Sequence, residues 1–190
     1  MEVIVENNVW ECYTNKNTQE FTSKKTARVQ LPRISSYFTE DTKVVLDIGC
    51  GGIKNIKLKK YLEDLGYVYY GIDPFNIAES TNLSIIEEIT SLKADIIILS
   101  NVLNTIKEPK VWRDILLQAS LCMHETSELL ITVYEGELTS TEKKEGKDKS
   151  PIVTRDGYQN RMLLKEYLPH ILKVFPNTTI LPKKIIRSTL

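Results

Sequence analysis

Short apolar runs alternate with amphipathic segments along most of this 190-residue chain. Nearly unbroken apolar runs occupy residues 44–48, 67–72, 95–99 and 128–134. Such runs are typical of strands that are buried on both faces of a parallel sheet. The segments between them place apolar residues at the spacing of helices that pack on one face. Strands and helices in alternation predict an α/β fold with a mostly parallel sheet.

Three helices are predicted between these strands. The first covers residues 53–65 and ends at Gly66, the second covers 84–92 behind a Ser-x-x-Glu capping box, and the third covers 109–122. Only 21 residues, 74–94, separate the second predicted strand from the third. A further parallel strand with its crossovers would need a helix, a strand and a second helix in that interval. We therefore expect the usual third strand of a parallel α/β sheet to be short or missing.

The carboxyl-terminal part predicts a different local arrangement. Residues 178–181 and 184–188 are expected to form an antiparallel pair at the edge of the sheet. The helical spacing over 164–175 contains Pro169, which is expected to divide it into two short helices. Residues 135–150 are charged, balanced in sign and free of aromatic side chains, which predicts a mobile loop. Either a lid or a solvated insertion fits that composition.

Composition and charge indicate one globular domain without a membrane segment. The chain has 42% hydrophobic residues and a formal net charge of zero, so it has no general attraction for nucleic acid. No apolar run reaches the roughly 18 residues of a membrane span, and the acidic start lacks the basic region of a signal peptide. Three widely spaced cysteines predict neither a disulfide framework nor a zinc site and favour a reducing cytoplasm. Residues 1–42 are expected to be an extension packed on the core domain, residues 43–190. The basic stretch at 24–33 is either a lip for an anionic substrate or a solvated face.

A glycine-rich turn, Asp47-Ile48-Gly49-Cys50-Gly51-Gly52, follows the first predicted strand. Glycines here let the backbone approach a ligand and adopt positive φ. Asp73 ends the second predicted strand 24 positions after Gly49, close to the spacing at which an acid binds a ribose. A dinucleotide turn would need a third glycine at position 54, which is Lys54, so NAD and FAD are disfavoured.

The turn with its leading acid resembles motif I of the class I S-adenosylmethionine (SAM) methyltransferases, with Ile53 in place of the family's third glycine. The resemblance implies a Rossmann-like methyltransferase sheet, mostly parallel with an antiparallel carboxyl-terminal strand. It also implies SAM as the cofactor and no metal. Asp47 and the turn backbone would hold the methionine end of SAM, and Asp73 would accept both ribose hydroxyls. The implied cofactor residues are Asp47, Gly49, Cys50, Gly51, Asp73, Phe75 (against the adenine) and Ser100.

The segment Ser100-Asn101-Val102-Leu103-Asn104 follows the third predicted strand, at the position of the family's motif IV. It lacks the two prolines and the aromatic residue of the DNA amino-methyltransferases and the Pro-Cys of the cytosine-C5 enzymes. We assign Asn101 and Tyr158 to orienting the acceptor, through hydrogen bonds and an aromatic wall. Turn and capping roles would explain the same residues.

The expected activity is methyl transfer from SAM to an unidentified acceptor, which is a nucleic acid, a nucleotide-like compound or a small molecule. The alternative is a non-catalytic SAM-binding or scaffold protein with the same fold. Residues 100–104 and the polar segment at 154–161 are loosely similar to methyltransferase-like proteins of phage genomes and DNA-modification clusters. That similarity implies the host cytoplasm as the location if a phage encodes the chain. A protein partner that presents the acceptor stays open.

Overall fold

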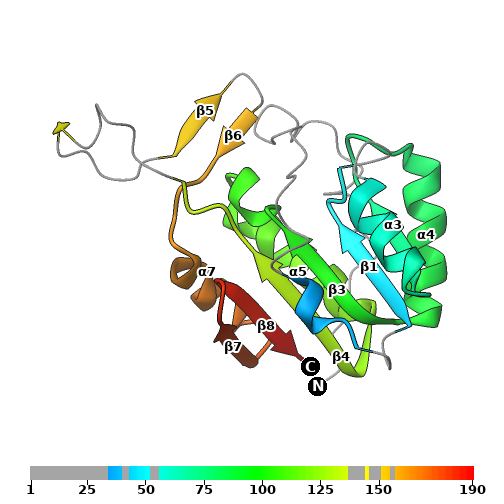
Figure 1. Cartoon of the computed structure of the whole chain (residues 1–190). Helices are drawn as coiled ribbons and strands as arrows, with labels where there is room; N and C mark the ends of the chain where they lie inside the picture. The colour runs from blue at the N-terminus through cyan, green and yellow to red at the C-terminus, as the bar shows by residue number, and fades with distance from the viewer. Residues whose placement is uncertain (1–33, 40–42, 52–55, 137–143, 146–150, 155–156) are drawn as a thin grey trace.

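A six-stranded sheet forms the centre of the protein, in the order β2-β1-β3-β4-β8-β7 (Figure 1). Strand β1 pairs in parallel with β2 and with β3, and β3 pairs in parallel with β4. Strand β8 pairs antiparallel with both β4 and β7. The expected α/β sheet with an antiparallel carboxyl-terminal pair is confirmed. The strands are β1 (Val44–Ile48), β2 (Val68–Ile72), β3 (Ala94–Ser100), β4 (Met123–Thr132), β7 (Asn177–Leu181) and β8 (Ile185–Thr189).

The computed structural model of the chain describes most of the core domain. Of the expected amino-terminal extension it includes only a short 3-10 turn and its neighbours, and most of the predicted loop at 135–150 lies outside it. Within the described part no helix is long and apolar enough to cross a membrane. The described residues are 34–39, 43–51, 56–136, 144–145, 151–154 and 157–190.

Helices cover both faces of the sheet. Helix α3 and the 3-10 turn η2 pack on one face, where Ile34 and Leu62 are fully buried with Val45 of β1. Helices α4, α5 and α7 pack on the other face, around Leu46 and Ile48 of β1. Alternate residues of β1 therefore lie on opposite faces, as the pleat requires. The helical elements are η2 (Ser35–Tyr37), α3 (Ile56–Asp64), α4 (Glu79–Leu92), η4 (Leu103–Thr105), α5 (Pro109–Leu121) and α7 (Leu164–Ile171).

Two predicted helix boundaries are wrong. Helix α4 begins at Glu79, so Ser84 lies inside the helix and does not cap it. The earlier start is stabilised by Asn82, whose side chain is buried and bonded to the backbone at the end of β2. Pro169 lies inside the single helix α7 and does not divide it. Tyr167 and Ile171, both fully buried, hold the helix on the sheet on either side of that proline.

No strand lies between β2 and α4, because residues 73–93 contain only a turn and that helix. This confirms the expectation that the third strand of a complete Rossmann-like sheet is missing. Within the described residues β2 is consequently the outer strand on its side of the sheet. A separate hairpin, β5 (Ile152–Thr154) and β6 (Gly157–Gln159), lies beyond the carboxyl ends of the parallel strands (Figure 1).

Candidate functional site

The glycine turn after β1 contacts the end of β2 and the loop after β3 at the carboxyl edge of the sheet. Gly49 and Gly51 have φ of +78° and +74°, the left-handed region that glycine adopts without strain. The N–H groups of Gly49 and Cys50 both donate to the Ile72 carbonyl at the end of β2, at 2.8 and 3.2 Å. A Cβ on Gly49 would lie 2.5 Å from Cγ2 of Val102, in the loop after β3. Glycine is thus required here by both conformation and space.

Asp73 connects the end of β2 to that turn. Its Oδ2 accepts the Gly51 N–H at 2.8 Å. Its Oδ1 accepts three hydrogen bonds of 2.9 Å each, from the backbone of Phe75 and from the backbone and side chain of Asn76. The Asp73 backbone is held in turn by Asn82, through bonds of 3.0 and 2.9 Å. Each carboxylate oxygen has about two acceptor directions. The described residues therefore leave one direction of Oδ2 for a ligand, while Oδ1 is fully used.

Asp47 lies near the end of β1, on the same face of the sheet as α3. Only 3% of the residue is exposed, and its Oδ2 accepts a 2.9 Å hydrogen bond from the Tyr69 hydroxyl. Burial raises the pKa of Asp47 to about 7; the Tyr69 hydrogen bond opposes that rise, and the nearby Asp73 carboxylate adds to it. The ion pairs among the described residues lie elsewhere, so no described cation pairs with Asp47 or Asp73.

The end of β3 adds polar groups beside the turn. The Ser100 hydroxyl lies 3.0 Å from the Thr132 hydroxyl of β4. Asn101 has φ of +56°, a conformation uncommon outside glycine, and its N–H donates to the Thr132 carbonyl at 2.8 Å. The side-chain oxygens of Asn101 and Asn104 are buried and have no hydrogen-bond partner in the described part of the chain. Unpartnered buried oxygens are rare and mark places where a ligand or water completes the bonding.

Tyr158 of β6 reaches this region from a distant part of the sequence. The hairpin docks on η4, where the Asn160 N–H donates to the Asn104 carbonyl at 2.6 Å. Tyr158 itself is 6% exposed, and its pKa is raised by burial and by the charge of Glu108. Burial raises the pKa of Tyr167 in α7, and the charge of Tyr158 adds to that rise. Tyr158 thus lies near Asn104, on the acceptor side of the predicted site.

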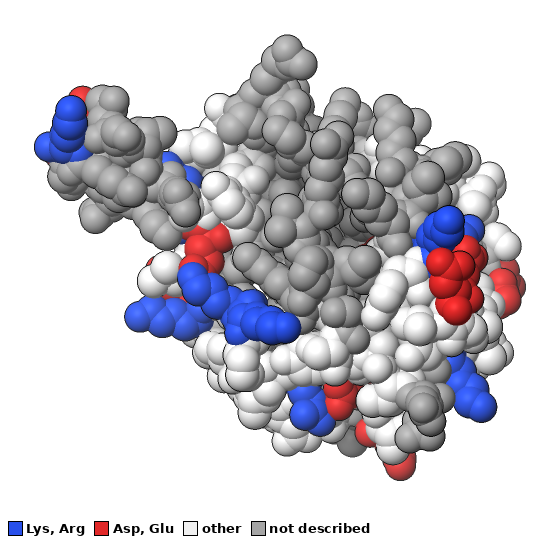
Figure 2. All heavy atoms as spheres, in the orientation of Figure 1, with Lys and Arg blue, Asp and Glu red and all other residues white. Residues whose placement is uncertain are grey.

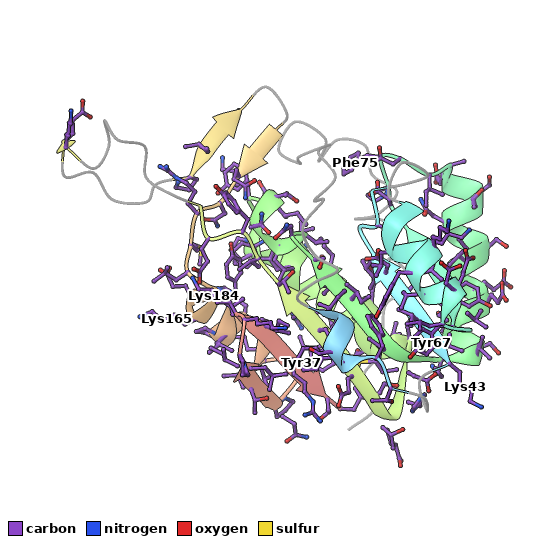
Figure 3. All side chains as sticks on the ribbon, viewed as in Figure 1. Tyr37, Lys43, Tyr67, Phe75, Lys165 and Lys184 are labelled. Atoms are coloured by element: carbon purple, nitrogen blue, oxygen red, sulfur yellow. The ribbon has the colours of Figure 1, made fainter. Side chains whose placement is uncertain are left out.

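Phe75 is half-buried in the turn after Asp73. Figure 3 places it at the carboxyl end of the parallel strands, with Lys43 and Tyr67 at the opposite end. Lysines gather elsewhere: Lys165 and Lys184 lie on the α7 and β8 side (Figures 2 and 3), where Lys184 pairs with Glu135. The sheet places β3 and β4 between β8 and β1, the strand that contains Asp47.

Comparison of the sequence with models of known protein families identifies the family of this chain. A family model described as a methyltransferase domain matches residues 18–180. The chain belongs to this methyltransferase family. A search of curated proteins found no match.

Solved structures agree with the fold of this methyltransferase. A SAM-dependent methyltransferase from Methanosarcina mazei is 18% identical, with a TM-score of 0.59, and the match covers 84% of this chain and 97% of that one. The glycopeptide N-methyltransferase MtfA, complexed with S-adenosyl-L-homocysteine (SAH), is 7% identical, with a TM-score of 0.55 and coverage of 87% and 91%. Human N-acetylserotonin methyltransferase, in complex with SAM, is 13% identical, with a TM-score of 0.55 and coverage of 85% and 51%. Identities this low show the fold alone.

The structure thus gathers the predicted residues of the methyltransferase into two neighbouring groups. Asp73 accepts the Gly51 N–H of the turn, whereas the Asp47 carboxylate is bonded to the Tyr69 hydroxyl beside them. Sequence reasoning missed three residues that shape the site: Tyr69, Asn82 and Val102. Tyr69 and Val102 resemble ordinary packing residues in the sequence. Asn82 lies before the predicted helix at 84–92, so local spacing contains no signal for it.

Proposed function

We propose that this methyltransferase binds SAM at the carboxyl ends of β1 and β2 and transfers its methyl group to an acceptor held beside β3. The single observation that carries the proposal is the pair of buried acids, Asp47 and Asp73, without a cation in the described residues. Burying a charge without a partner is costly, and the upward shift of the Asp47 pKa reflects that cost.

SAM has the charge that such a pair would bind. Its sulfonium and its ammonium are both positive, whereas the diphosphate of NAD or FAD is negative and would be repelled. We assign Asp47 to the ammonium. We assign Asp73 to the ribose, where the free acceptor direction of Oδ2 suits one hydroxyl without rearrangement of the turn. Phe75 would lie against the adenine.

The glycine turn and Ser100 would line the path between these two acids. Gly51 has no Cβ and Cys50 would contribute through its backbone, so a ligand can approach the chain closely there. Gly49 would act by letting the turn pack against Val102. Three findings support this assignment. The chain matches the methyltransferase family model, it has the fold of solved methyltransferases, and two of those solved structures contain SAH or SAM.

SAM supplies an electrophilic methyl group on a sulfonium, so in-line alignment of the acceptor supplies much of the rate. We assign that alignment to Asn101 and Tyr158. The buried Asn101 oxygen, which has no partner among the described residues, would accept a hydrogen bond from the acceptor, and the Tyr158 ring would form an aromatic wall. A planar acceptor such as a nucleobase, or a small molecule with a donor group, fits this chemistry.

The test is isothermal titration calorimetry with SAM and with SAH, on the wild type and on Asp73→Asn. We expect both ligands to bind the wild type, and Asp73→Asn to weaken both by about 10-fold or more, because a hydrogen bond to a charged group contributes about 1.5–3 kcal/mol. The control is Asp95→Asn. Asp95 also accepts two backbone N–H groups, from Lys43 and Val44, but at the opposite end of the strands. Asp95→Asn should therefore leave the binding of SAM and SAH unchanged.

Failure of the wild type to bind either ligand at millimolar concentration would refute the proposal. Methyl transfer is tested separately, by transfer of tritium from labelled SAM to DNA, RNA and small-molecule fractions. Binding of SAM without transfer to any fraction would favour a non-catalytic SAM-binding protein.

A further inference from the structure

Tyr69 makes a contact with the candidate site that its position in a strand does not suggest. It lies in the middle of β2, opposite Val45 of β1, and its ring packs on the α3 face of the sheet. Its hydroxyl donates to Asp47 Oδ2 at 2.9 Å. Within the described residues no hydrogen bond reaches the other oxygen, Oδ1, which is the one left for a ligand.

Gly71 provides the space for that contact. A Cβ on Gly71 would lie 3.0 Å from the Tyr69 hydroxyl, from its Cε1 atom and from Sγ of Cys50. Any larger residue at position 71 would press on the tyrosine ring and on the turn. Gly71 is the neighbour of Asp47 in the β1–β2 register. The tyrosine, the glycine and the acid therefore form one packed unit.

The groups that face Asp47 determine how readily it ionises. Tyr69 of β2 donates to it, the Asp73 carboxylate at the end of β2 repels its charge, and the Cys50 thiol lies beside the Tyr69 hydroxyl. The residues that α3 buries on this face, Leu58 and Leu62, are apolar. Burial and the Asp47 charge raise the pKa of Tyr69, so the phenol keeps its proton and acts as a donor. Among the described residues, Tyr69 is thus the group that favours the charged form of Asp47.

We propose that Tyr69 is a positioning residue of the cofactor site, which fixes Asp47 through Oδ2 so that Oδ1 can accept the ammonium group of SAM. The inference rests on the proposed function, because it assigns the ammonium to Asp47. Tyr69 itself does not touch the cofactor. Its loss should affect only ligands that carry the ammonium, and it should do so in a pH-dependent way.

The experiment measures SAH binding to Tyr69→Phe by calorimetry from about pH 6 to about pH 8.5. Loss of the donor raises the pKa of Asp47, so the carboxylate is neutral over more of this range. We expect affinity for SAH to fall on the order of tenfold near pH 7, with the difference narrowing as pH rises. As pH is lowered, the affinity of Tyr69→Phe for SAH should begin to fall about one pH unit above the pH at which the wild-type affinity begins to fall.

Two controls separate positioning from a general structural effect. Methylthioadenosine carries the same nucleoside without the ammonium, and its affinity should not change in Tyr69→Phe. Tyr70→Phe removes the neighbouring hydroxyl, which donates to Glu88 Oε1 at 2.6 Å in α4, and should leave SAH binding unchanged. A ¹³C-carboxyl titration of the ligand-free protein should show a higher Asp47 pKa in Tyr69→Phe alone.

Equal SAH affinity of Tyr69→Phe and wild type across the pH range would overturn the inference. Equal weakening of SAH and methylthioadenosine would also overturn it, because it would show a structural role. If the wild type bound no ligand, the proposed function would fail, and the carboxyl titration would still test the contact between Tyr69 and Asp47.

Discussion

Replacing Gly49 by alanine tests how the glycine turn is fixed against the loop after β3. The backbone at Gly49 has φ of +78°, and a left-handed conformation costs a residue with a Cβ about 1–2 kcal/mol. The new methyl group would also lie 2.5 Å from Val102 Cγ2, and overpacking of this kind costs about 1–3 kcal/mol. We therefore expect Gly49→Ala to lower the free energy of unfolding by roughly 2–5 kcal/mol.

Gly66→Ala is the matched control for this substitution. Gly66 has a similar φ of +85°, but a Cβ there would meet no atom within 4 Å. It should therefore lose only the conformational part, about 1–2 kcal/mol. The assay is urea unfolding followed by circular dichroism, with free energies from linear extrapolation.

Val102→Ala removes Cγ2, the atom that would clash with the new methyl group of Gly49→Ala. In the double variant the cost of the alanine at position 49 should fall to that seen at Gly66, which is a coupling of about 1–3 kcal/mol. Equal losses in Gly49→Ala and Gly66→Ala, or no relief from Val102→Ala, would refute the argument that the two loops are packed together.

Two further predictions concern polar groups outside the cofactor region. The Tyr167 hydroxyl is buried without a hydrogen-bond partner in the described part of the chain. Tyr167→Phe should therefore raise the free energy of unfolding, measured in urea, by about 1 kcal/mol. A lower free energy of unfolding in the variant would show that the hydroxyl is bonded. Burial alone would raise the pKa of Asp95, but hydrogen bonds from Val44, Lys43 and His124 lower that pKa overall. The stability that Asp95 contributes is therefore fully present above the pKa of the unfolded state, and it is lost as pH falls through the lower pKa of the folded state. The stability difference between wild type and Asp95→Asn should therefore shrink between neutral pH and about pH 3, and a constant difference would contradict this assignment.

Much of the sheet could be predicted from the sequence, because strands buried on both faces give apolar runs. The runs at 44–48 and 95–99 fall within β1 and β3 as observed, and the terminal antiparallel pair is confirmed. The short interval before β3 also predicted the missing strand correctly. These features depend on local composition and on chain length, which the sequence shows directly.

The start of α4 and the setting of Tyr158 depend on contacts between distant residues. Ser84 and Glu87 form a valid capping pattern, but Asn82 bonds to the backbone at Asp73, and that tertiary contact begins the helix earlier. Tyr158 reaches the loop after β3 only because its hairpin docks on η4. Local spacing contains no information on either contact.

The contact between Asp47 and Tyr69 joins residues 22 positions apart on adjacent strands. The sequence places both residues in strands, but the hydroxyl reaches the acid only because Gly71 has no side chain. The acids of the candidate site could thus be predicted, whereas the residue that orients one of them could not.

The position of β2 at the rim of the sheet has a consequence for association between molecules. Val68 donates to Lys43 and Ile72 accepts from Gly49, so these alternate residues point their peptide groups inward to β1. The peptide groups of Tyr69 and Gly71 consequently point outward, where no described strand pairs with them, and an unpaired strand edge can template aggregation with other chains. Because β2 has only five residues, its outer edge exposes few unpaired peptide groups. A short edge strand of this kind limits pairing with other molecules into larger sheets.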